Sequence, residues 1–194
     1  MKQLVKRLNC NKGVTMIELA VVLAIIGIMS LFMTPGIGEW VQNYRIKQAA
    51  RDMASDFQFA KLKAISISRQ QYCTVTFTIT LNGVLYDYII YSDDNHNLAY
   101  DGGEEIFKSV ILESEHRNVT LDSSQGGGNG ITFGSNANSQ PSVGFDSRGL
   151  PRDIQGNFQN GTVFMINSIT NKARRVDVTA AGAVSITEYQ YEES

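Results

Sequence analysis

The segment from Leu19 to Met33 constrains the fold of this chain most, because every residue in it except Ser30 is apolar or glycine. Counted from Val14, the apolar stretch has 20 residues. As a helix it would be about 30 Å long, which equals the thickness of the hydrocarbon core of a bilayer. One carboxylate, Glu18, lies near its front edge. A charge inside a membrane-spanning helix costs about 2.5–3.5 kcal/mol, so Glu18 requires an explanation.

Basic residues precede this stretch, and none follows it closely. The next basic residue after it is Arg45, and the first 13 residues contain no acidic side chain. By the positive-inside rule, this asymmetry predicts one membrane crossing, with a cytoplasmic N-terminus and an exported C-terminal part. The basic residues of the N-terminal segment are Lys2, Lys6, Arg7 and Lys12.

Two common kinds of export signal fit part of this pattern. A cleaved secretory signal has a basic front and an apolar middle, and the small residues near Thr34–Gly36 resemble a cleavage site. An uncleaved signal anchor has the same layout. A lipoprotein signal is excluded, because Cys10 precedes the apolar stretch. Neither kind of signal explains Glu18.

Residues 12–19, KGVTMIEL, resemble the prepilin cleavage motif of type IV pilins and type II secretion pseudopilins. In that family a prepilin peptidase cleaves after the glycine, here Gly13. It then methylates the new N-terminal residue, here Val14, where most members have Phe. The resemblance implies that the apolar helix is retained. It also implies that Glu18 pairs with the free amino group of a neighbouring subunit, which costs less in hydrocarbon than either charge alone.

Pro35 and Gly27 lie in the retained segment, and both residue types disfavour helix. Two interpretations remain open for Pro35–Gly38. It can end the membrane helix at the interface, with Trp40 as an aromatic anchor. Alternatively, as the resemblance implies, it is a section that melts or stretches during filament assembly.

Residues 36–70 predict an amphipathic continuation of the helix, because apolar residues recur at steps of three and four. We expect one helix from about Thr15 to Ser68 whose apolar stripe packs on the domain of the same chain. The stripe consists of Ile46, Ala49, Ala50, Met53, Phe57, Ala60, Ala64 and Ile65. The opposite face carries Arg45, Lys47, Arg51, Asp52, Asp56, Lys61 and Lys63.

From Tyr72 the sequence period changes to two. Threonines alternate with larger apolar residues as far as Leu81, and Asn82-Gly83 favours a type I′ hairpin turn into residues 84–91. Cys73 on this alternating strand is expected to be a buried apolar residue rather than a reactive thiol. Further strands are predicted at 105–112, 118–121, 142–145, 162–166, 174–179 and 183–187.

The predicted fold class is therefore α+β, a long N-terminal helix packed on a C-terminal antiparallel β-sheet domain, as in pilins. Four segments are expected: a leader at 1–13, a transmembrane or filament-core helix at 14–35, its amphipathic continuation at 36–70 and an exported β-rich domain at 71–194.

The C-terminal half resembles the GspH/FimT family of minor pseudopilins and minor pilins. Three motifs carry the resemblance: SVGFDSRGLP at 142–151, GTVFMI at 161–166, and ARRVDV at 173–178 followed by GAV at 182–184. The resemblance implies a structural subunit, near the tip or in priming, of a type II secretion pseudopilus or type IV pilus. It implies a protein of the bacterial inner membrane with a periplasmic domain. The implied partners are other pilin subunits and the prepilin peptidase.

Some FimT-like minor pilins bind DNA through a C-terminal arginine motif, so the resemblance also implies an alternative role in DNA uptake. The basic cluster that could serve it is Arg148, Arg152, Lys172, Arg174 and Arg175. After the first 13 residues the chain has 13 basic and 19 acidic residues, which argues against broad electrostatic binding to nucleic acid. Nearby acids, Asp146, Asp153 and Asp177, favour local ion pairs instead.

The polar loop from Asp93 to Glu104 matches part of a calcium-loop template, with oxygen ligands at Asp93, Asn95, Asn97, Asp101 and Glu104. Leu98 stands where the template requires glycine, and strands rather than helices flank the loop. A polar hairpin turn is therefore the simpler interpretation, with no other cofactor expected. No enzymatic constellation is present: His96 and His116 have no ligand or nucleophile at useful spacing and are expected at the surface.

Overall fold

The computed structural model describes residues 13–67 and 70–189, and of residues 31–36 only the backbone. The chain divides into two compact units, Met1–Gly38 and Glu39–Ser194, called here the first and second unit. The predicted leader, apart from Gly13, lies outside the described residues.

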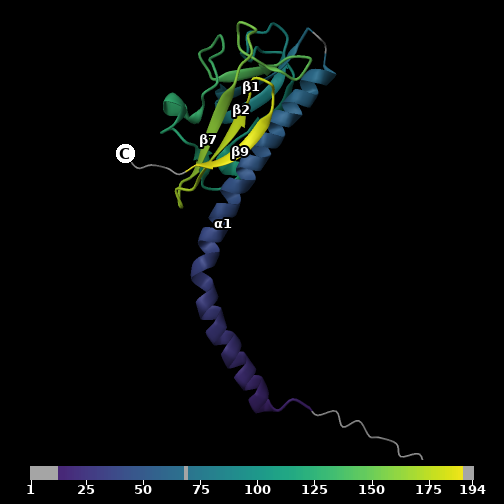
Figure 1. Cartoon of the computed structure of the whole chain (residues 1–194). Coiled ribbons are helices and arrows are strands. Elements are labelled where there is room, and N and C mark those ends of the chain that lie inside the picture. The colour runs from purple at the N-terminus through teal and green to yellow at the C-terminus, as the bar shows by residue number, and fades with distance from the viewer. Residues whose placement is uncertain (1–12, 68–69, 190–194) are drawn as a thin grey trace, which may run out of the picture. The chain divides into compact units, whose positions relative to one another are not determined.

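One helix, α1 (Met16–Ser66), accounts for almost the whole predicted helical segment (Figure 1). Thr15 caps its start, because the Glu18 N–H donates to the Thr15 hydroxyl at 3.3 Å. The sequence TMIE at 15–18 is thus the beginning of a capping box. The helix continues across Pro35, so the interpretation that Pro35 ends it is wrong.

Among the residues whose side chains are described, no helix combines the length and the apolarity needed to cross a membrane. The predicted span, residues 14–35, includes residues 31–35, whose side chains are outside the description. The membrane crossing therefore stays a prediction.

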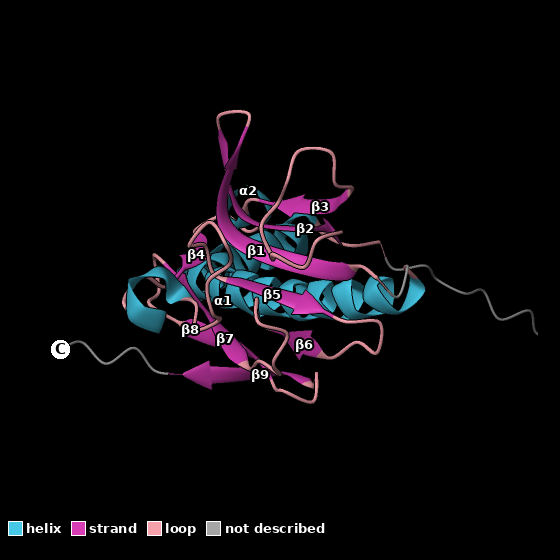
Figure 2. Cartoon of the chain, turned by 90° about the horizontal axis from the view of Figure 1, so that it is seen from above, coloured by secondary structure: helices cyan, strands magenta, loops and turns pink. Residues whose placement is uncertain are grey.

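The second unit contains two antiparallel sheets that lie across one side of its part of α1 (Figure 2). The first sheet has the order β3-β2-β1-β5-β6 and the second the order β4-β7-β8-β9. The strands are β1 (Tyr72–Leu81), β2 (Val84–Asp93), β3 (Ile106–Val110), β4 (Val119–Leu121), β5 (Ser142–Phe145), β6 (Pro151–Arg152), β7 (Gly161–Asn167), β8 (Ala173–Val178) and β9 (Val184–Tyr189). Two short helical segments are α2 (Leu112–Glu115) and η1 (Gly126–Gly130).

The predicted strands are confirmed, with three differences. The short strand β6 was not predicted. The sheet domain comprises two sheets rather than one, and the predicted strand at 105–112 ends early, at Val110. The Leu112 N–H donates to the Asp87 carboxylate at 2.7 Å instead of to a strand, so the chain turns into α2. At the β1–β2 hairpin, Asn82 and Gly83 both have positive φ, 51° and 80°, as a type I′ turn requires.

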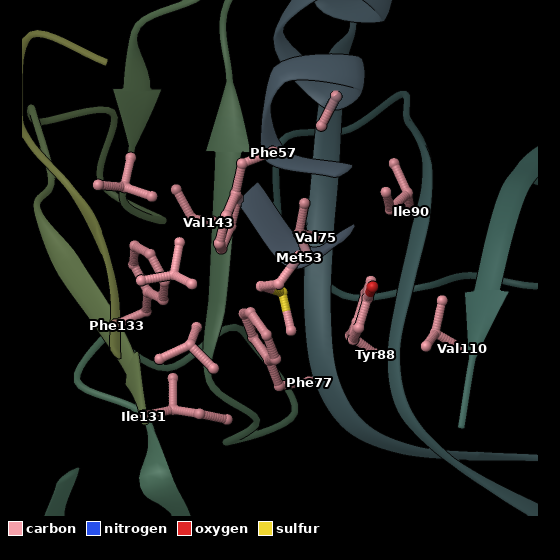
Figure 3. Packing of buried hydrophobic residues seen from close by; sticks show 14 of the residues in the cluster. Met53, Phe57, Val75, Phe77, Tyr88, Ile90, Val110, Ile131, Phe133 and Val143 are labelled. Carbon is pink, nitrogen blue, oxygen red and sulfur yellow. The ribbon is translucent and has the colours of Figure 1, made fainter. Parts of the chain in front are cut away.

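The apolar stripe of α1 is the centre of the main core (Figure 3). The Phe57 ring lies 6.3 Å from that of Phe77 in the first sheet. It lies 5.8 Å from the ring of Phe133, a residue outside both sheets. Buried residues of both sheets, including Phe77 of the first and Val163 of the second, form one cluster with this helix face. Two residues depart from the predicted faces: Ile65 is 55% exposed, whereas Asp56 is only 8% exposed.

Cys73 is fully buried on β1 and forms no disulfide, which confirms its predicted structural role. Burial raises the pKa of its thiol to about 12, although Lys63 lowers it slightly. The thiolate that would react is therefore scarce at neutral pH.

Candidate functional site

The first turns of α1 expose an apolar surface. Every large apolar side chain described between Val14 and Met29 is at least 49% exposed, and Met16 reaches 94%. Contiguous apolar surface of this size marks an interaction site, because water does not solvate it well. A bilayer or the helices of other subunits can cover it.

Glu18 is exposed in the first turn of α1, five residues after Gly13. A negative charge in the first turn is favourable, because it lies at the positive end of the helix dipole. The prediction for Glu18 concerned subunit contact and did not include the cap bond of its backbone N–H to Thr15. The Thr-x-x-Glu spacing was the available signal.

The predicted basic cluster does not converge on one point. Arg148 and Arg152 both bind Asp146, which lies at the end of β5. Their guanidinium Nη2 atoms lie 3.1 Å and 2.8 Å from the same carboxylate oxygen. Arg152 also lies over the Phe158 ring, 4.0 Å from its centroid. This pair of arginines therefore stabilises the β5–β6 turn.

Two further arginines of the cluster are also paired with carboxylates. Arg174 binds Glu188 on β9 at 2.8 Å, and Arg175 lies 3.3 Å from Asp177 on its own strand. Lys172 has no ion pair within the described residues. Four of the five predicted DNA contacts are thus engaged within the chain.

Lys172 and Arg174 instead join residues of α1 in a groove of about 460 Å³, called here the basic–aromatic groove. Asn167 and Asn118 donate to the side chain of Gln42, at 3.1 Å and 3.3 Å, and so fix the β7–β8 turn against α1. The groove lies wholly in the second unit. It is lined by Trp40, Asn43, Tyr44, Ile46, Lys47, Arg51, Lys172, Ala173, Arg174 and Glu188.

Asp146 is the carboxylate that binds both arginines of the β5–β6 turn. Burial alone would raise the pKa of its carboxyl. Hydrogen bonds from the Leu150 N–H, from Arg152 and from Arg148 outweigh burial, so the pKa lies below its usual value of 3.8. A carboxyl with a lowered folded-state pKa stabilises the fold above its unfolded-state pKa, and this contribution is lost as pH falls.

We therefore expect the free energy of unfolding to fall as the pH drops below about 4, with Asp146 contributing to the slope. Asp146→Asn should lower stability at neutral pH and flatten this part of the profile. Urea unfolding at a series of pH values measures both effects. Asp153→Asn is the control, because Asp153 bonds only within its own turn. Equal slopes for Asp146→Asn and the parent chain would contradict the assignment.

The loop proposed for calcium is folded around its own carboxylates. Asp93 accepts the N–H groups of His96 and Leu98 at 2.7 Å and 2.9 Å. Asp101 accepts the side-chain amides of Asn95 and Asn97 at 2.7 Å and 3.0 Å.

The last calcium candidate, Glu104, accepts the N–H groups of Asp94 and Asp101 at 3.2 Å and 2.8 Å. Burial raises its pKa despite these bonds. The described residues contain no group of three or more histidine, cysteine or acidic side chains arranged to bind a metal ion. The loop is a polar turn between β2 and β3 whose carboxylates accept hydrogen bonds from within the loop. Calcium binding stays a hypothesis.

His96 and His116 were expected at the surface, but both are partly buried. His96 is partly buried and its ring lies 4.0 Å from that of Tyr72. The His116 side chain is only 11% exposed, and its Nε2 lies 3.0 Å from Asp52. That contact lacks hydrogen-bond geometry. Both imidazoles serve packing.

Comparisons with known proteins agree with these features. Residues 49–182 match the family model described as type II transport protein GspH. Residues 8–34 match the prokaryotic N-terminal methylation motif. The chain is similar to pilin-like protein PilA1 of Thermus thermophilus, with 29% identity over 73% of this chain and 80% of the relative. No solved structure matches the chain.

Proposed function

We propose that this chain, which belongs to the family of type II transport protein GspH, is a minor pilin or pseudopilin. In this role it is a structural subunit near the tip of a type II secretion pseudopilus or type IV pilus, or in its priming complex. The observation that carries the proposal is the exposed apolar surface between Val14 and Met29, which lies within the residues that match the N-terminal methylation motif. Such a surface serves anchoring in a membrane first and helix packing in a filament later.

The proposed processing places a free amine and a carboxylate close together. Cleavage after Gly13 leaves Val14 as the N-terminal residue, with Glu18 five residues in. The apolar stretch is retained and anchors the subunit in the inner membrane, with the second unit in the periplasm. Pairing of Glu18 with the amine of a neighbouring subunit then sets the axial position of each helix.

Intact mass spectrometry of the subunit from cells that contain the prepilin peptidase tests the processing. We expect a chain that begins at Val14 and carries one added methyl group. Gly13→Ala is the matched control and should keep the N-terminus at Met1. A parent chain that begins at Met1, or anywhere after Pro35, would contradict the proposal.

Glu18→Ala tests assembly separately from processing. We expect normal cleavage but at least about a hundredfold less incorporation into filaments, because an amine left unpaired in hydrocarbon costs about 3–5 kcal/mol. Sheared-filament fractions quantify the incorporated subunit. Glu39→Ala is the control, since Glu39 is an exposed carboxylate on the same helix but outside the apolar stretch. Equal incorporation of Glu18→Ala and Glu39→Ala would refute the role of Glu18.

A role in DNA uptake is the second hypothesis, and the geometry supports it less. Arg148, Arg152, Arg174 and Arg175 are all paired with carboxylates, so few of their donors face outward together. Phosphate binding requires convergent and available positive charge.

A further inference from the structure

We propose that the basic–aromatic groove binds the phosphate headgroups of anionic phospholipids while the subunit is anchored in the membrane. This inference rests on the proposed function, because it assumes that residues 14–33 are inserted in a bilayer. It gives the second unit a lipid-binding function of its own, in addition to assembly through α1.

The first support is charge. Residues 39–194 contain 13 basic and 18 acidic side chains, so the second unit as a whole is repelled by an anionic surface. The groove reverses this balance, because four cations line it and Glu188 is its single acid. Glu188 binds Arg174, whereas Lys47, Arg51 and Lys172 have no ion pair within the described residues. Their charges are available to phosphate oxygens.

The second support is the aromatic pair at one end of the groove. Trp40 and Tyr44 are 68% and 53% exposed, and their rings stack with centroids 6.0 Å apart. Tryptophan and tyrosine favour the membrane–water interface, because one part of each ring system is apolar and the other forms hydrogen bonds. Ile169, on the same β7–β8 turn as Lys172, is 63% exposed and adds apolar surface.

The third support is the short connection to the apolar stretch. Trp40 follows Met33 by seven residues. That length of chain covers about 10 Å as a helix and at most about 25 Å when extended. Whatever the arrangement of the two units, Trp40 is therefore tethered within about 25 Å of Met33, the end of the inserted stretch.

Other anionic partners could meet the same cations, including an acidic segment of another subunit or single-stranded nucleic acid. The lipid surface is favoured because tethering keeps its headgroups at a high effective concentration beside the groove. No encounter with a second macromolecule is needed.

Trp40 is the only tryptophan of the chain, so its fluorescence reports on this groove. The full chain is reconstituted in vesicles of phosphatidylcholine alone, or with about 30% phosphatidylglycerol. In the anionic vesicles we expect a blue shift of Trp40 emission and at least about twofold less quenching by acrylamide. About 1 M salt, where the Debye length is about 3 Å, should remove most of the difference.

The double variant Lys47→Glu/Lys172→Glu should abolish the response to phosphatidylglycerol. Arg117→Glu is the control, because Arg117 is exposed but lies outside the groove lining. It is charge-matched to the single variant Lys47→Glu, which should already reduce the response. Circular dichroism checks that each variant is folded. Equal quenching in both kinds of vesicle, or an equal response of the double variant and Arg117→Glu, would overturn the inference.

Flotation of the vesicles after alkaline extraction separates this inference from the proposed function. A chain that floats with both vesicle types but shows no effect of lipid charge is anchored, and only the headgroup inference fails. A chain that floats with neither contradicts the anchoring and, with it, the headgroup inference. Shielding of Trp40 by an added pilin subunit or a single-stranded oligonucleotide, but not by phosphatidylglycerol, assigns the groove to that partner and overturns lipid binding.

Discussion

Asp93→Ala should destabilise the second unit by about 3–5 kcal/mol. Asp93 is fully buried at the end of β2. Its carboxylate accepts the N–H groups of Asn95, His96 and Leu98 and the Thr74 hydroxyl, at 3.3, 2.7, 2.9 and 3.2 Å. Alanine leaves these four donors without this acceptor, and the bonds from Leu98 and Thr74 are buried. Urea unfolding followed by circular dichroism measures the loss.

Neighbouring substitutions make this result specific. Asp94→Ala removes the adjacent carboxylate, which is exposed and accepts from Gln71 at 2.7 Å, and should cost less than about 1 kcal/mol. Asp93→Asn keeps one acceptor oxygen and should fall between the two. Similar stabilities for Asp93→Ala and Asp94→Ala would show that the loop does not depend on the buried carboxylate.

Asp56→Ala should cost about 2–4 kcal/mol, the second largest loss of folding stability that we expect from a single substitution. The Asp56 carboxylate accepts the Tyr88 hydroxyl at 2.5 Å and the Lys108 ammonium at 2.8 and 2.6 Å. It therefore joins α1 to both β2 and β3. The Lys108 side chain is 35% exposed and can turn to water, which keeps the cost below that of a fully buried pair.

Asp52→Ala is the matched control for these contacts of Asp56, because Asp52 lies one turn earlier on α1 and its side chain is 39% exposed. We expect a loss below about 1 kcal/mol for that variant. Burial, followed by the negative charge of Asp56, raises the pKa of Tyr88, so its hydroxyl stays a donor at neutral pH. Tyr88→Phe should therefore reproduce part of the Asp56→Ala loss. If Asp56→Ala lowers the free energy of unfolding no more than Asp52→Ala does, the stabilising link between α1 and the strands β2 and β3 is refuted.

Much of the fold follows from local sequence patterns. The steps of three and four before Ser68 predict the buried face of α1, and the alternation after Tyr72 predicts the paired strand β1. Asn82-Gly83 predicts the turn, because both residues tolerate positive φ. These features are local in sequence, so each can be recognised without knowing what packs against it.

The sites depend on contacts between distant residues and were harder to predict. Lys47 and Lys172 are separated by 125 residues, and no sequence pattern brings them into one groove. Asp56 was assigned to the polar face of α1 because its two partners, Tyr88 and Lys108, come from later strands. Arg174 likewise meets Glu188 only because the register of β8 and β9 places the two residues opposite each other.

Complete burial of Cys73 has a practical consequence. A chain that begins at Val14 has lost Cys10 and retains this one sulfhydryl, near the start of β1. Alkylating reagents reach it only when the strand separates from its neighbours, so the labelling rate measures how often that happens. The alkylation rate of Cys73 therefore reports local opening of the native core. It can be compared between subunits inside and outside a filament without adding a probe.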